Sequence, residues 1–168
     1  MCTMKKLILG LLFFGFAAHM FAQVITLSEV RIAVNYKYLD AVDNMEAAIP
    51  VQLLEDKVGL YDIKKSELYS DEYDTYTISF YIPDGKIVAV FDQNGDILRT
   101  IEKFKDVKLP EDVLTAVAKR FPNWSVVSDV YRVNYHAGTN VARKMYKITL
   151  TNGDEKIKVK TDADGNFM

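Results

Sequence analysis

The chain has 168 residues, 49% of them hydrophobic, and carries 21 lysine and arginine side chains against 23 aspartate and glutamate side chains. This length and apolar content are sufficient for one domain, or two small ones, built around an ordinary hydrophobic core. The small acidic excess argues against a nucleic-acid partner, because nucleic-acid-binding proteins present a basic stripe on their surface.

The first 22 residues have the features of a secretory signal peptide. Lys5 and Lys6 precede the apolar run 7–18, which is shorter than the roughly 20 residues that a membrane-spanning helix needs. We therefore expect cleavage after Ala22, a periplasmic or secreted protein, and no membrane span afterwards. Cys2 would leave with the signal peptide, so residues 23–168 contain no cysteine and must fold without disulfides.

Residues 30–38, "VRIAVNYKY", alternate strictly between apolar and polar positions, which predicts a strand that extends or covers the first part of the sheet. Residues 49–61, "IPVQLLEDKVGLY", follow with helical spacing of their apolar residues. Residues 66–70, "SELYS", are expected to form a short strand.

A shift of 70 positions aligns residues 76–98 with residues 146–168 without a gap. Each copy predicts two strands around an Asp-Gly or Asn-Gly turn, then a second turn, "DQNGD" or "DADGN", and a last strand that begins near Ile97 or Phe167. Seven aligned pairs are identical, namely Tyr76/Tyr146, Ile78/Ile148, Asp84/Asp154, Lys86/Lys156, Ile87/Ile157, Asp92/Asp162 and Gly95/Gly165.

A second helix and a long strand are predicted ahead of the second copy. In residues 109–124, Pro110 marks the helix start, and Val113, Val117 and Phe121 form an apolar stripe. Residues 124–135 read as a strand whose alternation slips near Asp129, which indicates a β-bulge.

These elements predict an α+β fold of two tandem units, each a helix packed on an antiparallel sheet of three to four strands. Residues 1–22 would be the signal peptide, residues 23–105 the first unit with its extra N-terminal strand, and residues 106–168 the second unit.

The order of three short motifs resembles the PepSY-like, beta-lactamase-inhibitor-like family of small exported bacterial proteins. The motifs are "FPNW" within residues 118–131, "YKITL" within residues 144–150, and "DADGN" within residues 160–168, and residues 76–98 form a looser earlier copy without an "FP.W". The resemblance implies tandem α+β units, an exported location and binding to another protein, including inhibition of a hydrolase. It implies no catalytic residue.

No catalytic constellation and no cofactor site is found in the sequence. His136 would be the only histidine after signal removal, and no cysteine would remain, which excludes a Cys-His pair and a zinc site of the usual composition. There is no G-x-S-x-G segment and no glycine-rich phosphate loop. We expect a protein that is not an enzyme, with His136 exposed in a loop.

Two acidic loops are weak candidates for calcium. They contain Asp92 and Asp96 in one copy, and Asp162 and Asp164 in the other. Their glycine is fourth rather than sixth, and the bidentate glutamate of a calcium loop is missing, so turn formation is the preferred interpretation and no metal is expected.

The two copies differ on the face predicted to point outward. Tyr81, Val88 and Val90 occupy the positions that Thr151, Lys158 and Lys160 hold in the second copy. Either the N-terminal strand covers this apolar patch or a partner binds there, with Tyr69 and Tyr73 nearby. Lys156, Lys158 and Lys160 themselves read as a solvated strand face.

The sequence therefore favours an exported, non-enzymatic binding module that recognises a protein or envelope component. The alternative is a periplasmic small-ligand or calcium binder that uses the cleft between the units. The identity of the partner and the oligomeric state stay open.

Overall fold

The structure is a computed structural model that describes residues 34–168. The predicted signal peptide and the first four residues of the predicted N-terminal strand, 30–33, lie outside the described residues.

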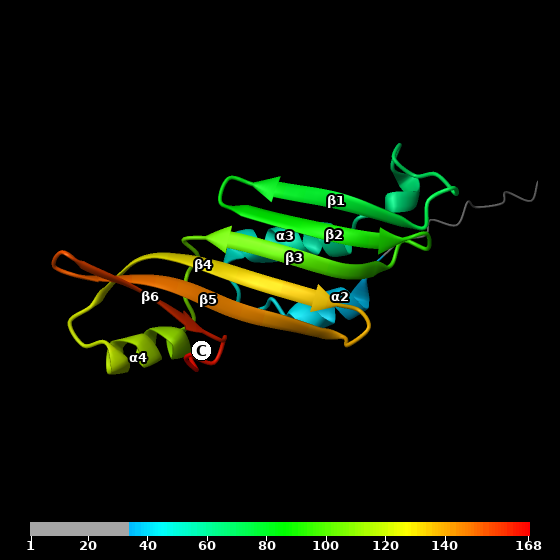
Figure 1. The fold of residues 1–168 in the computed structure, drawn as a ribbon. Coiled ribbons are helices and arrows are strands. Elements are labelled where there is room, and N and C mark those ends of the chain that lie inside the picture. The colour runs from blue at the N-terminus through cyan, green and yellow to red at the C-terminus, as the bar shows by residue number, and fades with distance from the viewer. Residues whose placement is uncertain (1–33) are drawn as a thin grey trace, which may run out of the picture. The chain divides into compact units, whose positions relative to one another are not determined.

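Six antiparallel strands form a single sheet in chain order, β1-β2-β3-β4-β5-β6 (Figure 1). Strand β3 of the first sequence copy pairs with β4, so both copies contribute to one continuous sheet. The expected α+β class with an antiparallel sheet is thereby confirmed. The strands are β1 Thr75–Ile82, β2 Gly85–Asp92, β3 Ile97–Lys105, β4 Ser125–His136, β5 Val141–Asn152 and β6 Glu155–Thr161.

Within residues 34–168, three α-helices and a 3-10 turn accompany the sheet. They are α2 Tyr36–Val42, α3 Ile49–Gly59, η2 Ile63–Lys65 and α4 Glu111–Arg120. Helices α3 and α4 confirm the two predicted helices. Proline stands at the start of α3, and acidic residues fill the first turn of α4, where they complement the helix dipole.

The predicted N-terminal strand is wrong where it can be followed. Tyr36 begins helix α2, in which Tyr38 and Val42 are buried four residues apart on one helix face. Asn35, the residue before α2, binds the turn before β3 through its side chain. Its Nδ2 donates to the Gly95 carbonyl at 3.2 Å, and its Oδ1 accepts from the Ile97 N–H at 2.7 Å.

Residues 66–70 form no strand either. The hydroxyl of Ser66 accepts from the Leu68 N–H at 3.1 Å, and that of Ser70 accepts from the Glu72 N–H at 3.3 Å. These local side-chain bonds hold the backbone in turns and so compete with strand pairing. Strand β4 therefore has no counterpart between α3 and β1.

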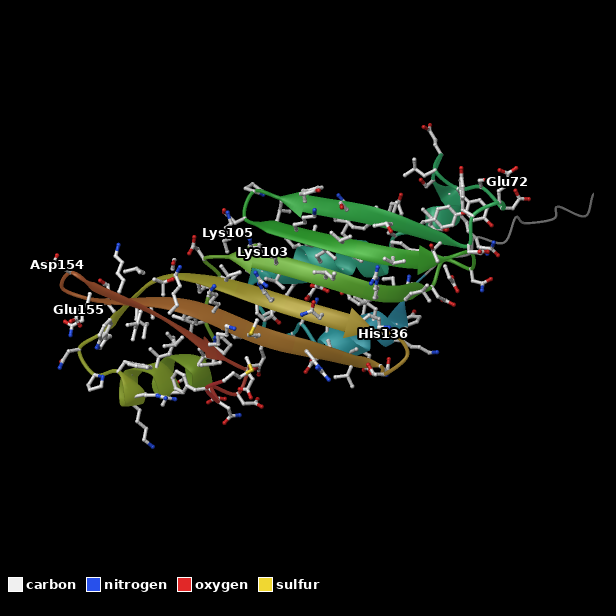
Figure 2. The ribbon with its side chains drawn as sticks, viewed as in Figure 1. Glu72, Lys103, Lys105, His136, Asp154 and Glu155 are labelled. Carbon is white, nitrogen blue, oxygen red and sulfur yellow. The ribbon has the colours of Figure 1, made fainter. Side chains whose placement is uncertain are left out.

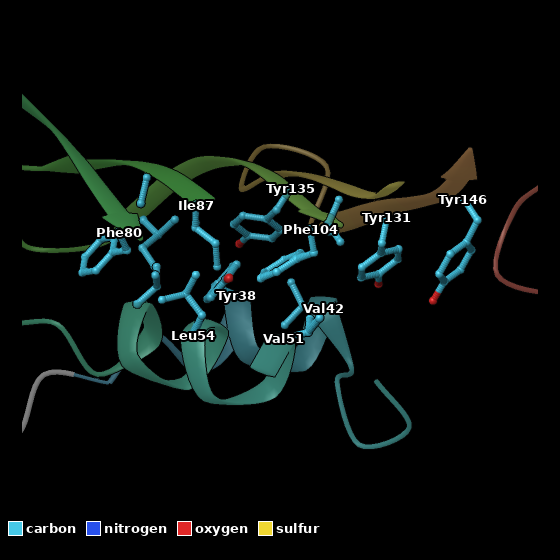
Figure 3. Packing of buried hydrophobic residues seen from close by; sticks show 14 of the residues in the cluster. Tyr38, Val42, Val51, Leu54, Phe80, Ile87, Phe104, Tyr131, Tyr135 and Tyr146 are labelled. Carbon is cyan, nitrogen blue, oxygen red and sulfur yellow. The ribbon is translucent and has the colours of Figure 1, made fainter. Parts of the chain in front are cut away.

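One face of the sheet is buried from β1 to β5 and half-buried on β6, and Figure 3 shows side chains of this face on the side of the sheet where α2 and α3 lie. Tyr38 of α2 meets Tyr135 of β4 edge-on at 5.4 Å between ring centroids. Tyr131 and Tyr146 stack at 4.6 Å across β4 and β5. The predicted bulge is present as a register shift between Val126 and Ser128, just ahead of Asp129.

The two predicted acidic turns are confirmed and have the same hydrogen bonds. Asp92 Oδ1 accepts from the N–H groups two and four residues later, at 2.8 and 2.9 Å, and Asp162 Oδ1 does so at 3.0 and 2.8 Å. Gly95 and Gly165 both adopt positive φ angles, 91° and 82°, which glycine tolerates without strain. After the second turn only an isolated bridge between Thr161 and Phe167 follows, in the place of β3.

These bonds predict equal costs for removing either aspartate. We expect Asp92→Ala and Asp162→Ala each to lower the free energy of unfolding by about 1 kcal/mol, because two backbone N–H groups lose their acceptor. Urea unfolding followed by circular dichroism measures both. Asp164→Ala is the control, since within residues 34–168 its carboxylate accepts no hydrogen bond, and a loss as large as that of Asp162→Ala would contradict the assignment.

Candidate functional site

The sheet has a second face, which points away from α2 and α3, and we call it the open face. In Figure 1 those two helices lie behind β1–β5, and none of the described helices lies over the side that the viewer sees. The open face is formed by alternate strand residues, so cross-strand pairing sets which of them are neighbours. It is the natural place to look for the partner-binding residues predicted from the sequence.

Three of those residues lie together on the open face. Tyr81 is 64% exposed, while Val88 and Val90 on β2 are half-buried. Val88 lies between Ser79 of β1 and Ile101 of β3, and Ile101 is 55% exposed. We call Tyr81, Val88, Val90 and Ile101 the apolar strip. Ile101 was missed by sequence reasoning, because its place beside Val88 depends on the register of β3.

Tyr69 and Tyr73 do not belong to the apolar strip. Their rings contact Tyr76, with centroids 5.6 and 6.3 Å away, and Tyr76 points to the buried face near the start of β1. The Tyr76 hydroxyl donates to the Ser70 carbonyl and accepts from the Ser70 N–H. This tyrosine cluster braces the loop before β1, at the opposite end of that strand from Tyr81.

Basic side chains surround the apolar strip on the open face. Lys86, Lys103 and Arg132 stand directly opposite one another on β2, β3 and β4, and Lys147 stands opposite Lys160. Figure 2 labels Lys103 and Lys105 on β3. The ten basic residues of the open face are Lys86, Arg99, Lys103, Lys105, Arg132, Arg143, Lys147, Lys156, Lys158 and Lys160.

The open face carries little negative charge on its described strands. Within residues 34–168, Asp92, the last residue of β2, is the only acidic residue at its strand positions. Glu102 and Asp129 point to the buried face, and Glu155 of β6 alternates with Lys156 and so lies on the other side of the strand. Lys86 lies over the ring of Tyr81, with its Nζ 5.0 Å from the centroid. Its hydrogen bond lowers the pKa of the Tyr81 phenol.

His136 also lies on this face. It is exposed, but it is the last residue of β4 rather than a loop residue as predicted. Its Nδ1 accepts the N–H of Gly138 at 3.1 Å. Together with Arg99, Asn134 and Arg143 it lines a shallow hollow of about 350 Å³.

The four acidic calcium candidates serve the turns instead. Asp92 and Asp162 use one carboxylate oxygen each as the acceptor of two backbone N–H groups, and those groups include the N–H of Asp96 and Asp164. The hydrogen bond from the Asn166 side chain lowers the pKa of Asp162. Over residues 34–168 no three Asp, Glu, His or Cys side chains gather closely enough to hold a metal ion.

A second concavity lies beside the start of α3. This groove of about 800 Å³ is bounded by residues 46–53, by the turn between β1 and β2, and by residues 104–108 after β3. Its walls are mainly apolar, with Ile49 70% exposed and Leu53 66% exposed. Its lining comes from the first sequence half and the segment directly after β3, so it is not the cleft between the two units in which the alternative function would place a small ligand.

The core encloses two carboxyl groups, Glu55 of α3 and Glu102 of β3, each 1% exposed. Tyr38 and Thr100 donate their hydroxyl protons to Glu102 Oε1 at 2.9 and 2.6 Å. The second oxygen of each carboxyl has no hydroxyl, amide or backbone donor. A proton donated by Glu55 to Glu102 would supply the missing partner of these oxygens.

Burial raises the pKa of both glutamates, since removal from water disfavours the charged form. The nearby Lys144 ammonium opposes this and donates at 3.0 Å to the Asp43 carbonyl after α2. Burial also raises the pKa of Asp129 to about 6. The glutamate pair is the only carboxyl pair of this kind in the described core, but it is sealed from solvent and does not line the groove beside α3.

Comparisons with known proteins supply no relative. No protein-family model matches the chain, and neither the curated proteins nor the solved structures contain a significant match. Separately, none of the helices within residues 34–168 is long and apolar enough to cross a membrane.

The shared proton predicts a pH-dependent stability. Because the folded-state pKa is raised, the pair stabilises the fold fully below the ordinary glutamate pKa, and this contribution is lost as the pH rises toward the raised value. In Glu55→Gln the new side-chain amide would donate an N–H to an ionised Glu102. We therefore expect Glu55→Gln to be more stable than the unchanged protein by about 1–2 kcal/mol at pH 8, with a smaller difference at pH 5.

Thermal unfolding at pH 5, 6.5 and 8 measures this difference. Glu67→Gln, an exposed carboxylate outside the core, is the control and should leave the pH dependence unchanged. Parallel curves for Glu55→Gln and the unchanged protein would show that the two glutamates share no proton.

Proposed function

We propose that the chain is an exported, non-enzymatic binding module that recognises a protein through the open face of its sheet. The observation that carries this proposal is the apolar strip. Val88, Val90, Ile101 and Tyr81 adjoin one another on a face that none of the described helices covers. A contiguous exposed apolar surface with a polar rim is typical of protein interaction sites.

The size of the open face suits such a role. Six strands about 4.8 Å apart, with roughly eight residues each at about 3.3 Å per residue, span on the order of 700 Å². A typical stable interface buries about 800 Å² on each partner. Inhibition of a hydrolase, as the PepSY-like resemblance implies, is one activity that binding of this kind would produce.

We also propose that the two sequence copies descend from a duplicated PepSY-like α+β unit. The matching hydrogen bonds of the turns at Asp92 and Asp162, and the helix before each hairpin, support this origin. The missing counterpart of β4 in the first half marks where the copies have diverged.

The test replaces the centre of the apolar strip. Val88→Lys with Val90→Lys is expected to weaken capture of a partner from envelope extract at least tenfold, because two lysines would have to lose water inside an apolar contact. Capture is quantified by mass spectrometry after cross-linking, and folding is checked by circular dichroism.

The control is Leu114→Lys, which alters an exposed leucine of α4 away from the open face. A partner counts only when Leu114→Lys retains it and the double variant loses it. If the unchanged protein, the double variant and Leu114→Lys all recover the same proteins, binding through the apolar strip is refuted.

A second candidate function, small-ligand binding, is supported by the apolar groove beside α3. We expect the neutral dye Nile red to bind there and Leu53→Glu to weaken its binding several-fold, since the charge would stand in the apolar wall. Fluorescence titration measures the affinity. Leu60→Glu, at the other end of α3, is the matched control, and equal effects of the two substitutions would exclude the groove.

A further inference from the structure

Several basic residues of the open face lie directly opposite one another on neighbouring strands, an arrangement that lowers the stability of the sheet. Lys86, Lys103 and Arg132 stand in direct cross-strand register, as do Lys147 and Lys160. Like charges placed directly opposite destabilise a sheet. Within residues 34–168, none of the ten basic residues has a carboxylate within 4.0 Å. Their mutual repulsion is therefore not offset inside the described fold.

The charge is also segregated. The chain as a whole has a formal charge of −2, yet the strand positions of the open face hold ten basic residues and only Asp92 as an acid. Among residues 34–168, the other acidic side chains lie in helices, turns, loops and the core, apart from Glu155 at the start of β6. A near-neutral total thus conceals a strongly basic surface.

We propose that the open face binds an acidic protein surface, with the apolar strip at the centre of contact and the basic rows aligned with carboxylates of the partner. This inference rests on the proposed function and adds the chemistry of the partner. Complementary charge around an apolar centre speeds association and fixes the register of two proteins.

The composition of the face favours a protein over a nucleic acid. Single-stranded nucleic acids bind on platforms of several aromatic rings, on which bases stack. Tyr81 is the only phenyl, phenol or indole ring among the open-face strand positions, and it stands at the end of β1. The aliphatic residues Val88, Val90 and Ile101 have no role on a phosphate backbone.

The test uses poly-L-glutamate and a DNA duplex of equal total charge as probes. Binding is measured by fluorescence anisotropy at 50, 150 and 500 mM NaCl. Lys103→Gln with Arg132→Gln removes two charges from the central basic row. Lys57→Gln with Lys119→Gln removes two exposed charges from α3 and α4 and is the matched control.

We expect the unchanged protein to bind poly-L-glutamate with an affinity that falls as salt rises. The open-face variant should bind it roughly tenfold more weakly, and the control less than twofold more weakly. The open-face variant should also unfold at the same or a higher temperature than the unchanged protein, because the cross-strand repulsion is relieved.

Tighter binding to the duplex than to poly-L-glutamate would overturn the proposal in favour of a nucleic acid. Absence of binding, or equal losses in both variants, would also overturn it. Val88→Lys with Val90→Lys separates this result from the proposed function, because the added lysines preserve poly-L-glutamate binding. If that variant still loses a captured partner while poly-L-glutamate never binds, the protein-binding function stands and the acidic partner is excluded.

Discussion

The ladder between β3 and β4 is the contact on which the rest of the molecule depends. It runs through seven residue pairs, from Arg99 opposite His136 to Lys105 opposite Val130. Without it the chain would be two three-stranded sheets, each with two edges of unpaired backbone groups. With it, strand alternation continues across both halves. The core residues of the strands lie on one face of the sheet, and every residue used in the binding proposal lies on the other, open face.

The same ladder places a carboxyl group, that of Glu102, inside the core. Glu102 lies on β3 between Ile87 and Val133, and Glu55 comes to it from α3. Neither would remain buried as an isolated anion, because desolvation of a lone carboxylate costs several kcal/mol. Donors from α2 and from β3 itself stabilise Glu102, and one proton shared with Glu55 would leave the pair with a single negative charge instead of two. The pair therefore ties both helices to the strand at the centre of the sheet.

Sequence reasoning succeeded where the signal was local and failed where it was not. Helices α3 and α4 and the turns at Asp92 and Asp162 were predictable, because proline, acidic first turns and Asp-x-x-Gly patterns act over a few residues. The alternating pattern of residues 30–38 was misleading at its end, where helix α2 begins at Tyr36 and Tyr38 is buried on one helix face. The hydrogen bond between Asn35 and Ile97, far along the chain, is not visible in that pattern. The glutamate pair gave no signal, since its members are 47 positions apart in the chain.

The charge of the open face could not be predicted from the sequence, because it depends on which strands pair. Lys156, Lys158 and Lys160 are visible as a row on one strand, and in isolation a solvated strand is a sufficient explanation. A solvated strand is no longer a sufficient explanation once the strand register is known. The register places Lys147 opposite Lys160, and it forms a second basic row, Lys86, Lys103 and Arg132, on the same face of the sheet. One such row costs little in water, but several in register repel one another in the folded state. A sheet that retains this repulsion is stabilised less than it could be, and contact with opposite charge would remove the deficit. In the proposed complex the valines of the first half and the lysines of the second would have complementary roles, since apolar contact supplies affinity and long-range charge guides the encounter.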